Sequence, residues 1–576
     1  MENEPERTSG AGVRADISVG TGADIADDEQ AGSAADIDVV VIGAGIGGLY
    51  AVHRFRADGL TVQAFEAADG VGGTWYHNRY PGARCDVESV DYSYSFADEL
   101  QQEWDWSERY ATQPEILEYL NHVADRFDLR RSIEFGTRVT AAHFDEATDL
   151  WNVTIEAART DGAARGRRLT CRHCVFATGS LSVANFPEIP GLGDFTGRVL
   201  HTAQWPHETV DFTGLRVGVI GTGSSGIQLV PEVAREAASV TVFQRTPNYS
   251  IPAANRPIDD VERREQKATY GERRRKSRLS GGGSPFIPHE KNTLEVDAAE
   301  RERVYEHYWN LGGVLFSKAF PDQMRDEHAN QLAREFAERK IRSVIADQSV
   351  ADHLIPTDHP IGTKRIVTDS GYFQTYNLDH VELVNLRRTP IDRITADGPV
   401  TVGGGDEAAR LHELDVLIFA TGFDAVTGAM DAIDIRGRDH RSLSDAWSDG
   451  VRSYLGLMVA GFPNLFLVNG PGSPGVLANM VLASEHHVDW IADTIGQLRS
   501  DGRRAIEPDE NAQDDWMAEC ARLADQTLFP RADSWYLGAN IPGKPRVFML
   551  YPGGFGNYRK VVQELTDAGY EGFALR

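Results

Sequence analysis

The fold is decided by the stretch Ile37-Asp38-Val39-Val40-Val41-Ile42-Gly43-Ala44-Gly45-Ile46-Gly47-Gly48. Its apolar run predicts a buried parallel strand, and the glycine-rich turn that follows opens a helical pattern that continues to Arg56. A further strand is predicted from Thr61 to Phe65. Strand, glycine turn, helix and strand form a βαβ unit, so the sequence predicts an α/β fold with a parallel sheet.

The glycines of this turn have the spacing of a dinucleotide-binding loop. Gly43 permits the tight turn, Gly45 lets the backbone approach a pyrophosphate, and Gly48 permits close packing of the helix, whose N-terminus favours phosphate. Glu66 ends the second strand, 21 residues after Gly45. A carboxylate there accepts hydrogen bonds from ribose hydroxyls and repels a 2′-phosphate, which favours FAD or NAD over NADP.

The same pattern recurs near the middle of the chain. A strand from Leu215 to Ile220 is followed by a helical pattern to Ala237 and a strand from Val240 to Phe243, and the loop between the first strand and the helix is Gly221-Thr222-Gly223-Ser224-Ser225-Gly226. Arg245, 22 residues after Gly223, occupies the position equivalent to Glu66, and Thr246 follows it. A guanidinium and a hydroxyl favour a 2′-phosphate. The sequence therefore predicts FAD in the first loop and NADPH in the second.

Two Rossmann-like domains are expected, the second nested in the first, with a helical insertion. We divide the chain into a disordered acidic tail (1–35), the first part of an FAD-binding domain (36–170), the first part of an NADPH-binding domain (171–252), the helical insertion (253–358), and the second parts of the NADPH-binding domain (359–410) and the FAD-binding domain (411–576). The tail is rich in Gly, Ala, Asp and Glu and has no apolar core of a secretory signal.

Bulk composition excludes several classes of protein. The 576 residues are 41% hydrophobic and 25% charged, the usual balance of a globular protein. A net charge of −28 argues against a nucleic-acid partner. No apolar run reaches the roughly 18 residues that a membrane span needs. Four cysteines in a chain of this length predict no disulfide scaffold, and we expect a cytoplasmic monomer or small homo-oligomer.

Two motifs are interpreted as structural. Cys171 and Cys174 have the spacing of a redox dithiol or half a zinc site, but the expected strand from Leu169 to Ala177 points positions three apart to opposite faces. They are expected to be plain strand thiols, and no metal site is predicted. The run Arg273-Arg274-Arg275-Lys276, in the insertion, is interpreted as a solvated helix face in preference to an anion site.

A fingerprint lies between the two glycine loops: Phe195, Gly197, His201, Trp205 and Pro206 fit F-x-G-x-x-x-H-x-x-x-W-P. A second pattern is Gly72-Gly73-Thr74-Trp75 followed by Tyr80-Pro81-Gly82-Ala83-Arg84-Cys85-Asp86. With these motifs the chain resembles the Baeyer–Villiger monooxygenases from about Asp36 to its C-terminus. Within that family, the insertion segments 280–285 and 311–320 are most similar to steroid monooxygenase and, more distantly, to phenylacetone monooxygenase.

The resemblance implies a reaction and its residues. NADPH reduces FAD, which captures dioxygen as a flavin C4a-peroxide that attacks a ketone and gives an ester or lactone. Arg365, in Ile361-Gly362-Thr363-Lys364-Arg365, matches the arginine that holds the anionic peroxide, and Asp86 matches its acidic partner. Lys364 matches a residue that grips the 2′-phosphate with Arg245 and Thr246. The resemblance further places Thr74 and Trp75 at the flavin and Trp535 on a loop that closes over the nicotinamide.

The fingerprint itself is interpreted as a linker. His201 and Trp205 are expected to relay the cofactor-bound state between the domains without performing chemistry. The expected substrate is a bulky ketone, such as a progesterone-like steroid, or an aryl or polycyclic ketone. Two alternatives stay open: a flavin-containing N- or S-monooxygenase, which shares both loops, and a non-catalytic flavoprotein that only binds nucleotides.

Overall fold

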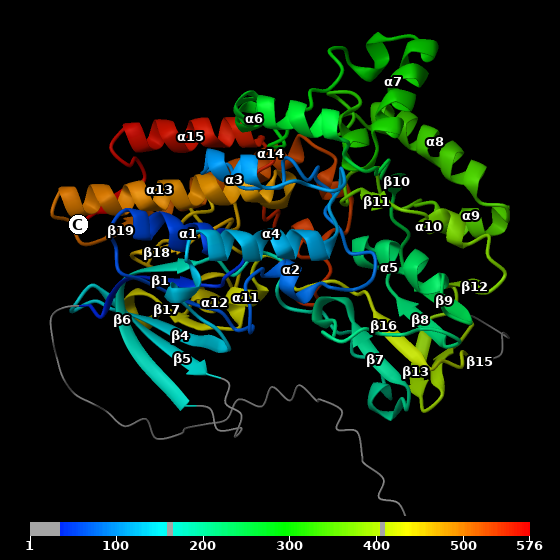
Figure 1. Ribbon diagram of the computed structural model, residues 1–576, viewed down its shortest axis with the longest axis horizontal. Coiled ribbons are helices and arrows are strands. Elements are labelled where there is room, and N and C mark those ends of the chain that lie inside the picture. Colours follow the sequence, from blue (N-terminus) through cyan, green and yellow to red (C-terminus); the bar gives the residue numbers. More distant parts are fainter. Residues whose placement is uncertain (1–34, 158–164, 404–408) are drawn as a thin grey trace, which may run out of the picture. The chain divides into compact units, whose positions relative to one another are not determined.

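The structure is a computed structural model that describes residues 35–157, 165–403 and 409–576 (Figure 1). The disordered tail predicted over residues 1–35 lies outside these ranges except for its last residue. Residues 35–576 form one compact unit, built on two separate sheets that each carry one of the glycine loops.

The first sheet contains the strand that opens the fold. Its strands are β1 (Ile37–Ile42), β2 (Val62–Phe65), β3 (Ile133–Glu134), β4 (Thr137–Asp145), β5 (Leu150–Ala157), β6 (Arg165–Phe176), β17 (Asp434–Arg436) and β18 (Leu465–Leu467). Their order is β17-β4-β5-β6-β1-β2-β3, with β18 also paired to β6. The central pairs β6-β1, β1-β2 and β2-β3 are parallel, as the apolar run predicts, whereas β4, β5 and the start of β6 form an antiparallel meander.

Helices from both ends of the chain belong to this first unit. They are α1 (Ile46–Ala57), α2 (Thr74–His77), α3 (Asp98–Glu103), α4 (Gln113–Arg126), α11 (Gly428–Asp431), α12 (Leu443–Ala446), α13 (Met480–Ser500), α14 (Glu510–Asp525) and α15 (Phe555–Asp567). The longest, α13, packs against α1, and both share a core with alternate residues of β1 such as Val39 and Val41 (Figure 1). A short antiparallel pair, β19 (Ile506–Pro508) and β20 (Phe573–Leu575), brings the strand before α14 beside the end of the described chain. Burial of α1 on this core fixes the turn that precedes it.

The second sheet is parallel and has the order β12-β9-β8-β16-β7. Its strands are β7 (Arg198–His201), β8 (Arg216–Ile220), β9 (Ser239–Gln244), β12 (Val381–Asn385) and β16 (Val416–Phe419), and its helices are α5 (Ser224–Ala234) and α10 (Tyr372–Thr375). A small antiparallel sheet of β13 (Ile391–Thr395), β14 (Gly398–Thr401) and β15 (Arg410–Leu411) adjoins it in sequence. Because its segments lie between β6 and β17 of the first sheet, the second Rossmann-like unit is nested in the first, as predicted.

Strand pairing places two domain boundaries differently from the expected ones. The segment Cys171–Phe176 was assigned to the second unit, but it pairs with β1 in the first sheet. The segment Val416–Phe419 was assigned to the first unit, but it pairs with β8 in the second. An apolar strand does not reveal its partner when that partner is distant in sequence. The chain therefore crosses between the units after Phe176 and again after Phe419.

The predicted helical insertion is present. It contains α6 (Asp260–Leu279), α7 (Ala298–Leu311), α8 (Glu327–Val344) and α9 (Gln348–Leu354) and is attached through the parallel pair β10 (Ser250–Pro252) and β11 (Val367–Asp369). Its own core includes Tyr305, Phe316 and Phe336. Helix α6 packs against α3 and α15 of the first unit, so the insertion contacts a unit to which it is not covalently joined (Figure 1).

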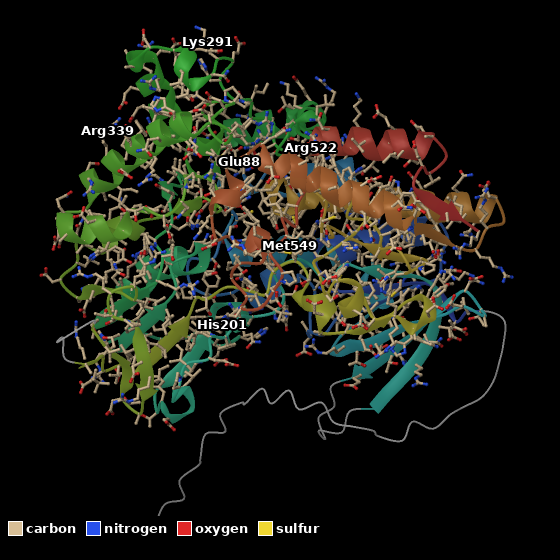
Figure 2. All side chains as sticks on the ribbon, turned by 180° about the vertical axis from the view of Figure 1, so that it is seen from behind. Glu88, His201, Lys291, Arg339, Arg522 and Met549 are labelled. Carbon is tan, nitrogen blue, oxygen red and sulfur yellow. The ribbon has the colours of Figure 1, made fainter. Side chains whose placement is uncertain are left out.

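The basic run on α6 corrects the expectation of a solvated face. Arg274 is only 3% exposed and donates to the Asp91 carbonyl and the Ser93 hydroxyl. Arg273 forms ion pairs with Asp91 and with Glu88, which Figure 2 labels. Only the second half of the run points to solvent. The prediction was wrong for the first two residues of the run. A run of basic residues does not show that a distant segment places hydrogen-bond acceptors against it.

The cysteine prediction also needs a correction. Both Cys171 and Cys174 are fully buried in the same hydrophobic core, so they do not point to opposite faces. At Cys171 strand β6 exchanges its antiparallel partner β5 for the parallel partner β1, and twist at such a change breaks simple alternation. The neighbouring Cys171 thiol and burial raise the pKa of Cys174, and the complete burial of both side chains is that of structural thiols. Within the described ranges, no cluster of three or more metal-ligating side chains occurs.

None of the helices in the described parts of the chain is long and apolar enough to cross a membrane.

Candidate functional site

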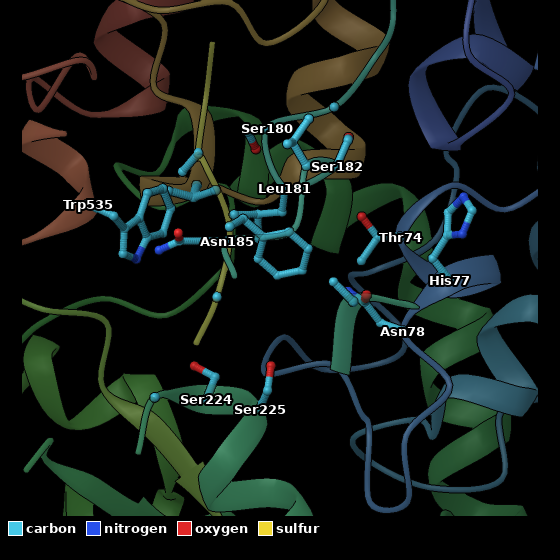
Figure 3. Close-up of a pocket in the computed structure, with 18 of the residues that line it drawn as sticks. Thr74, His77, Asn78, Ser180, Leu181, Ser182, Asn185, Ser224, Ser225 and Trp535 are labelled. Carbon is cyan, nitrogen blue, oxygen red and sulfur yellow. The ribbon is translucent and has the colours of Figure 1, made fainter. Parts of the chain in front are cut away.

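One cavity of about 1190 Å³ lies where the two glycine loops approach each other. Residues from both sheets and from the C-terminal region line it. So do residues of the two crossing segments, which follow Phe176 and Phe419 and carry the chain from one unit to the other. Figure 3 shows Thr74 and Asn78 on the wall formed by the first unit and Ser224 and Ser225 at the N-terminus of α5 on the facing wall. The predicted cofactor-binding residues that line the cavity are Gly43, Gly45, Glu66, Thr74, Trp75, Asp86, Gly221, Thr222, Gly223, Ser224, Ser225, Arg245, Thr246, Lys364, Arg365 and Trp535.

The first loop has the geometry that its glycines predict. Gly43 has a φ of +102°, which disfavours a side chain, and a Cβ on Gly48 would lie 1.9 Å from the Gly43 carbonyl oxygen. Gly45 lies against Gly73, whose Cα would be 3.4 Å from an added Cβ. The backbone N–H of Gly72 donates to the Ala44 carbonyl at 3.0 Å. The Gly72–Trp75 motif thus packs on the glycine turn and leaves a bare backbone cradle that fits a pyrophosphate.

Glu66 lies at the end of β2, beside this cradle, and is only 7% exposed. Its carboxylate accepts hydrogen bonds from the backbone N–H groups of Ala44 at 2.7 Å and Ala68 at 2.9 Å. Each carboxylate oxygen has further lone pairs, so the group can hold the turn and still accept from a ribose hydroxyl. Trp75 is nearly buried and donates its indole N–H to the Tyr92 hydroxyl at 3.2 Å, which fixes the ring at the cavity wall.

The second loop repeats this geometry. Gly221 has a φ of +113°, and a Cβ on Gly226 would lie 2.2 Å from the Gly221 carbonyl oxygen. Nothing lies within 4 Å of the position that a Cβ on Gly223 would take, so that glycine faces open space. Thr222 donates its hydroxyl to the Thr246 carbonyl at 2.9 Å, tying the loop to the residue after Arg245. This second cradle fits a second pyrophosphate at the N-terminus of α5.

Cations gather beside the second loop. Arg245 and Lys364 both line the cavity, and Arg387 donates from Nη2 to the Thr246 hydroxyl at 3.2 Å. Burial, together with Arg245 and Arg387, lowers the pKa of Lys364. The sequence prediction included Arg245, Thr246 and Lys364 but missed Arg387. No local pattern marks Arg387, because β12 becomes a neighbour of β9 only through pairing between segments that are distant in sequence.

Asp86 and Arg365 meet as predicted. The Arg365 guanidinium donates from Nε to Asp86 Oδ2 at 2.7 Å and from Nη2 to Asp86 Oδ1 at 2.9 Å. Its Nη1 donates to the Val476 carbonyl at 2.6 Å. Burial opposes the charged form of Arg365, but the Asp86 carboxylate more than offsets this and raises the pKa of the guanidinium. Arg365 is therefore a fixed cation at the wall of the cavity.

Arg365 also lines a second, smaller cavity of about 200 Å³, which the sequence did not reveal. Parts of the insertion, the segment before β11 and the C-terminal region meet there. Its lining residues are Gly281, Val314, Ser317, Met324, Gly362, Arg365, Ile366, Pro474, Leu477, Phe529, Tyr536, Tyr551, Pro552 and Gly554. Both insertion segments singled out in the sequence contribute to it, through Gly281 and through Val314 and Ser317. No local pattern predicts such a cavity, since its walls are far apart in sequence.

The fingerprint lies at the edge of the second sheet and between the units. His201 ends β7, is 2% exposed, and accepts at Nδ1 from the Ala203 backbone at 3.0 Å. Its Nε2 lies 3.2 Å from the Thr421 hydroxyl, which donates to the Asn185 carbonyl at 2.6 Å. Burial lowers the pKa of His201 to about 4, so the ring is neutral. His201, labelled in Figure 2, thereby joins the two crossing segments.

The other fingerprint residues have packing roles in the second unit. Phe195 lies in a small core with Phe243 and Phe419, and a Cβ on Gly197 would come within 2.4 Å of the Asp415 carbonyl oxygen. Trp205, followed by Pro206, is buried against Phe212. Of the whole fingerprint segment, Ala203 and Gln204 reach the large cavity.

Trp535 lines the large cavity, and Figure 3 shows it and Asn185 to one side of Ser224 and Ser225. The loop that carries it is attached to the second crossing segment. Asn540 donates to the Phe423 carbonyl at 2.8 Å, and Lys544 forms an ion pair with Asp424. The position of Trp535 thus depends on the segment through which the chain passes between the two units.

Comparisons with known proteins agree with this site. Residues 36–256 match the family described as flavin-binding monooxygenase-like. The chain is 43% identical to a Baeyer–Villiger monooxygenase of Pseudooceanicola batsensis, over 93% of this chain and 96% of the relative. It is 40% identical to a phenazine N-monooxygenase of Lysobacter antibioticus, over 93% of this chain and 97% of the relative.

A solved structure is also closely similar. An oxidized steroid monooxygenase bound to NADP superimposes with a TM-score of 0.88 at 58% sequence identity, covering 94% of this chain and 99% of that one. The similarity in sequence and in structure therefore extends over both nucleotide loops, the crossing segments and the insertion.

Proposed function

The chain belongs to the Baeyer–Villiger monooxygenase family, and from that premise we propose that it oxygenates a bulky ketone to an ester or lactone. The enzyme depends on FAD and NADPH. FAD, when bound, supplies the activated oxygen, and NADPH supplies the electrons. The first glycine cradle and Glu66 would hold FAD, and the second cradle with Arg245, Thr246 and Lys364 would hold NADPH.

The observation that carries this proposal is the position of Arg365 at both cavities. A guanidinium has five N–H groups, of which two donate to Asp86 and one to Val476, and the Tyr536 hydroxyl lies beside a further one, so at least one is left to stabilise negative charge on a reacting oxygen. Its charge is fixed by Asp86 and does not vary with pH. Arg365, which lines both cavities, would therefore hold the developing anion, and the surrounding walls would exclude water.

The smaller cavity can hold part of a ketone. Phe529, Tyr551 and Leu477 contribute apolar surface to its lining, beside polar groups such as Arg365 and Ser317. Segments of the insertion shape it, and it is in these segments that the sequence resembles steroid monooxygenase. We assign it to the hydrocarbon part of the ketone, with the carbonyl directed to Arg365. A progesterone-like C20 keto-steroid, an aryl ketone or a polycyclic ketone satisfies this description.

A ketone panel tests the proposal. The flavin-loaded enzyme is incubated with NADPH, isotopically labelled dioxygen and a methyl-ketone steroid, an aryl ketone, cyclohexanone or acetone, and products are analysed by mass spectrometry. We expect one labelled oxygen atom in an ester or lactone, with the bulky ketones giving the highest kcat/KM. Preference for acetone would contradict the substrate class, and absence of any oxygenated ketone would contradict the reaction.

A second candidate function is oxygenation at nitrogen or sulfur. The 40% identity to a phenazine N-monooxygenase favours retaining it. An aromatic N-heterocycle and a sulfide are therefore assayed beside the ketones. An N-oxide formed with a higher kcat/KM than every ester would replace the proposed ketone reaction.

A further inference from the structure

Strands β9 and β12 end side by side, and a cation follows each: Arg245 lines the large cavity, and Arg387 contacts its lining residue Thr246. Strands β9 and β12 are parallel and in register, with Asn385 opposite Gln244, and the Leu386 N–H donates to the Gln244 carbonyl at 2.8 Å. Arg245 therefore leaves the sheet beside Leu386, and both of these residues line the cavity. Arg387, the next residue along, leaves the sheet at the same edge.

The Arg387 side chain turns towards Thr246. Its Nη2 donates to the Thr246 hydroxyl at 3.2 Å and also pairs with Asp358. The other oxygen of Asp358 lies 2.7 Å from Nδ1 of His359, a side chain that is almost completely buried. Although burial raises it, His359 and Arg387 lower the pKa of Asp358 to about 2, so the carboxylate is ionised. Arg387 is thus held beside Thr246 by an anion that is itself fixed in place.

The side chains around Thr246 carry a net positive charge that matches a phosphate group. Arg245, Lys364 and Arg387 contribute three positive charges and Asp358 one negative, which leaves +2. The other nearby carboxylate, Asp533, pairs with Arg546 at 2.6 Å and so is already neutralised. A phosphate monoester carries about −1.5 to −2 at neutral pH. This net charge therefore complements a phosphate in magnitude as well as in sign.

We propose that Arg387 is a third cation for the 2′-phosphate of NADPH, held ready by Asp358, and that it strengthens the preference for NADPH over NADH. The inference rests on the proposed function, because it places the adenosine ribose of NADPH beside Arg245 and Thr246. In the nucleotide complex, Arg387 shares its donors between the phosphate and Asp358, and Asp358 repels the phosphate while it orients Arg387. Arg387 is a binding residue and takes no part in the oxygenation.

Binding of two nucleotides that differ only in this phosphate tests the inference. Adenosine 2′,5′-bisphosphate and 5′-AMP are titrated into the FAD-loaded enzyme by calorimetry, a readout that does not require turnover. For Arg387→Ala we expect roughly fivefold to tenfold weaker binding of the bisphosphate, the usual effect of losing one partly exposed charged contact, and unchanged binding of 5′-AMP. Arg388→Ala is the matched control, because it removes an equal charge from the next, exposed position and should have no effect.

Asp358→Asn separates phosphate binding from a purely structural role. If Arg387 only anchors the segment that contains Asp358, both variants weaken both nucleotides, and the inference is overturned. If Arg387 binds phosphate, only the bisphosphate is affected, by about twofold at most in either direction, because loss of the repelling carboxylate and loss of the orienting anion oppose each other. Equal affinity of wild type and Arg387→Ala for the bisphosphate also overturns the inference.

Arg245→Ala distinguishes the two levels of failure. If Arg245→Ala weakens binding of the bisphosphate but Arg387→Ala does not, the proposed NADPH site is supported and the role of Arg387 is contradicted. When wild type binds both nucleotides equally, the phosphate assignment of the side chains around Thr246 falls, together with the inference. Steady-state KM for NADPH and NADH provides a second readout, with Arg387→Ala expected to raise the first selectively.

Discussion

The Asp86 carboxylate holds the Arg365 guanidinium through two hydrogen bonds of 2.7 and 2.9 Å, although the residues are 279 positions apart. Asp86 lies in a loop of the first unit, and Arg365 lies in the segment that leads into β11 at the base of the insertion. Neither element can form this pair alone. The arrangement that we assign to catalysis is therefore complete only when the two units are docked.

Removal of Arg365 should separate flavin reduction from oxygenation. Arg365→Ala leaves both glycine cradles intact, so NADPH should still bleach the flavin absorbance, but ester formation should fall by at least about a hundredfold, as for loss of a single group that stabilises an anion. Stopped-flow absorbance and product analysis measure the two steps. Arg84→Ala is a control at another cavity arginine, and retention of full ester yield in Arg365→Ala would contradict the assigned role.

The glycines of the second loop should fall into two classes. Gly226→Ala places a Cβ 2.2 Å from the Gly221 carbonyl, so we expect loss of roughly 2 kcal/mol or more of stability, as for overpacking. Gly223→Ala meets nothing within 4 Å and should leave stability unchanged but weaken NADPH, because its methyl group intrudes where the pyrophosphate would lie. Thermal unfolding and nucleotide titration distinguish them. Equal behaviour of the two variants would argue against a nucleotide at this loop.

His201 should make stability depend on pH. Burial lowers its pKa to about 4 in the folded protein, against 6.5 for an ordinary histidine. Between these values the unfolded chain binds a proton that the folded chain does not, so this contribution is present above pH 6.5 and is lost as the pH falls towards 4. This contribution of His201 to the free energy of unfolding amounts to about 3 kcal/mol between the two ends of this pH range.

A non-titrating variant isolates this contribution. The free energy of unfolding of His201→Gln should decline less than that of the wild type between pH 7 and pH 4, while His173, which is buried with a pKa of about 4, cancels because both proteins contain it. Parallel pH profiles would show that His201 is not the neutral, buried ring that its hydrogen bonds require.

Neighbouring arginines on α6 should differ sharply in their effect on stability. Arg274→Ala leaves the buried Asp91 carbonyl and Ser93 hydroxyl without their donor, and we expect a loss of about 2–4 kcal/mol. Arg275→Ala, at the exposed next position, should change stability by less than about 0.5 kcal/mol. Chemical denaturation measures both. Similar values for the two would revive the interpretation of the whole run as a solvated face.

The parts of this molecule that sequence predicts are those set by local spacing. Glu66 and Arg245 follow their glycine loops at a fixed distance because one helix and one strand of standard length separate them, so the nucleotide preference of each loop could be inferred. The nested α/β architecture follows from the repetition of that pattern. Family resemblance then supplied Asp86 and Arg365, which no local spacing connects.

The parts that sequence did not predict depend on pairing between distant segments. Arg387 became a candidate only when β12 was seen to pair with β9, and Arg274 became a buried residue only when α6 was seen against the loop that follows Asp86. The domain boundaries expected at residues 171 and 411 failed for the same reason. The periodicity of apolar residues predicts which side chains are buried, but it does not predict which distant segment packs against them.

The insertion is covalently part of the second unit, yet α6 fastens it to the first through Arg273 and Arg274. It therefore acts as a strut that spans two bodies and is fixed to both. The short segment at its base that leads into β11 carries Arg365. The cation at the centre of the proposed chemistry is thus placed by an element that is tied to both units.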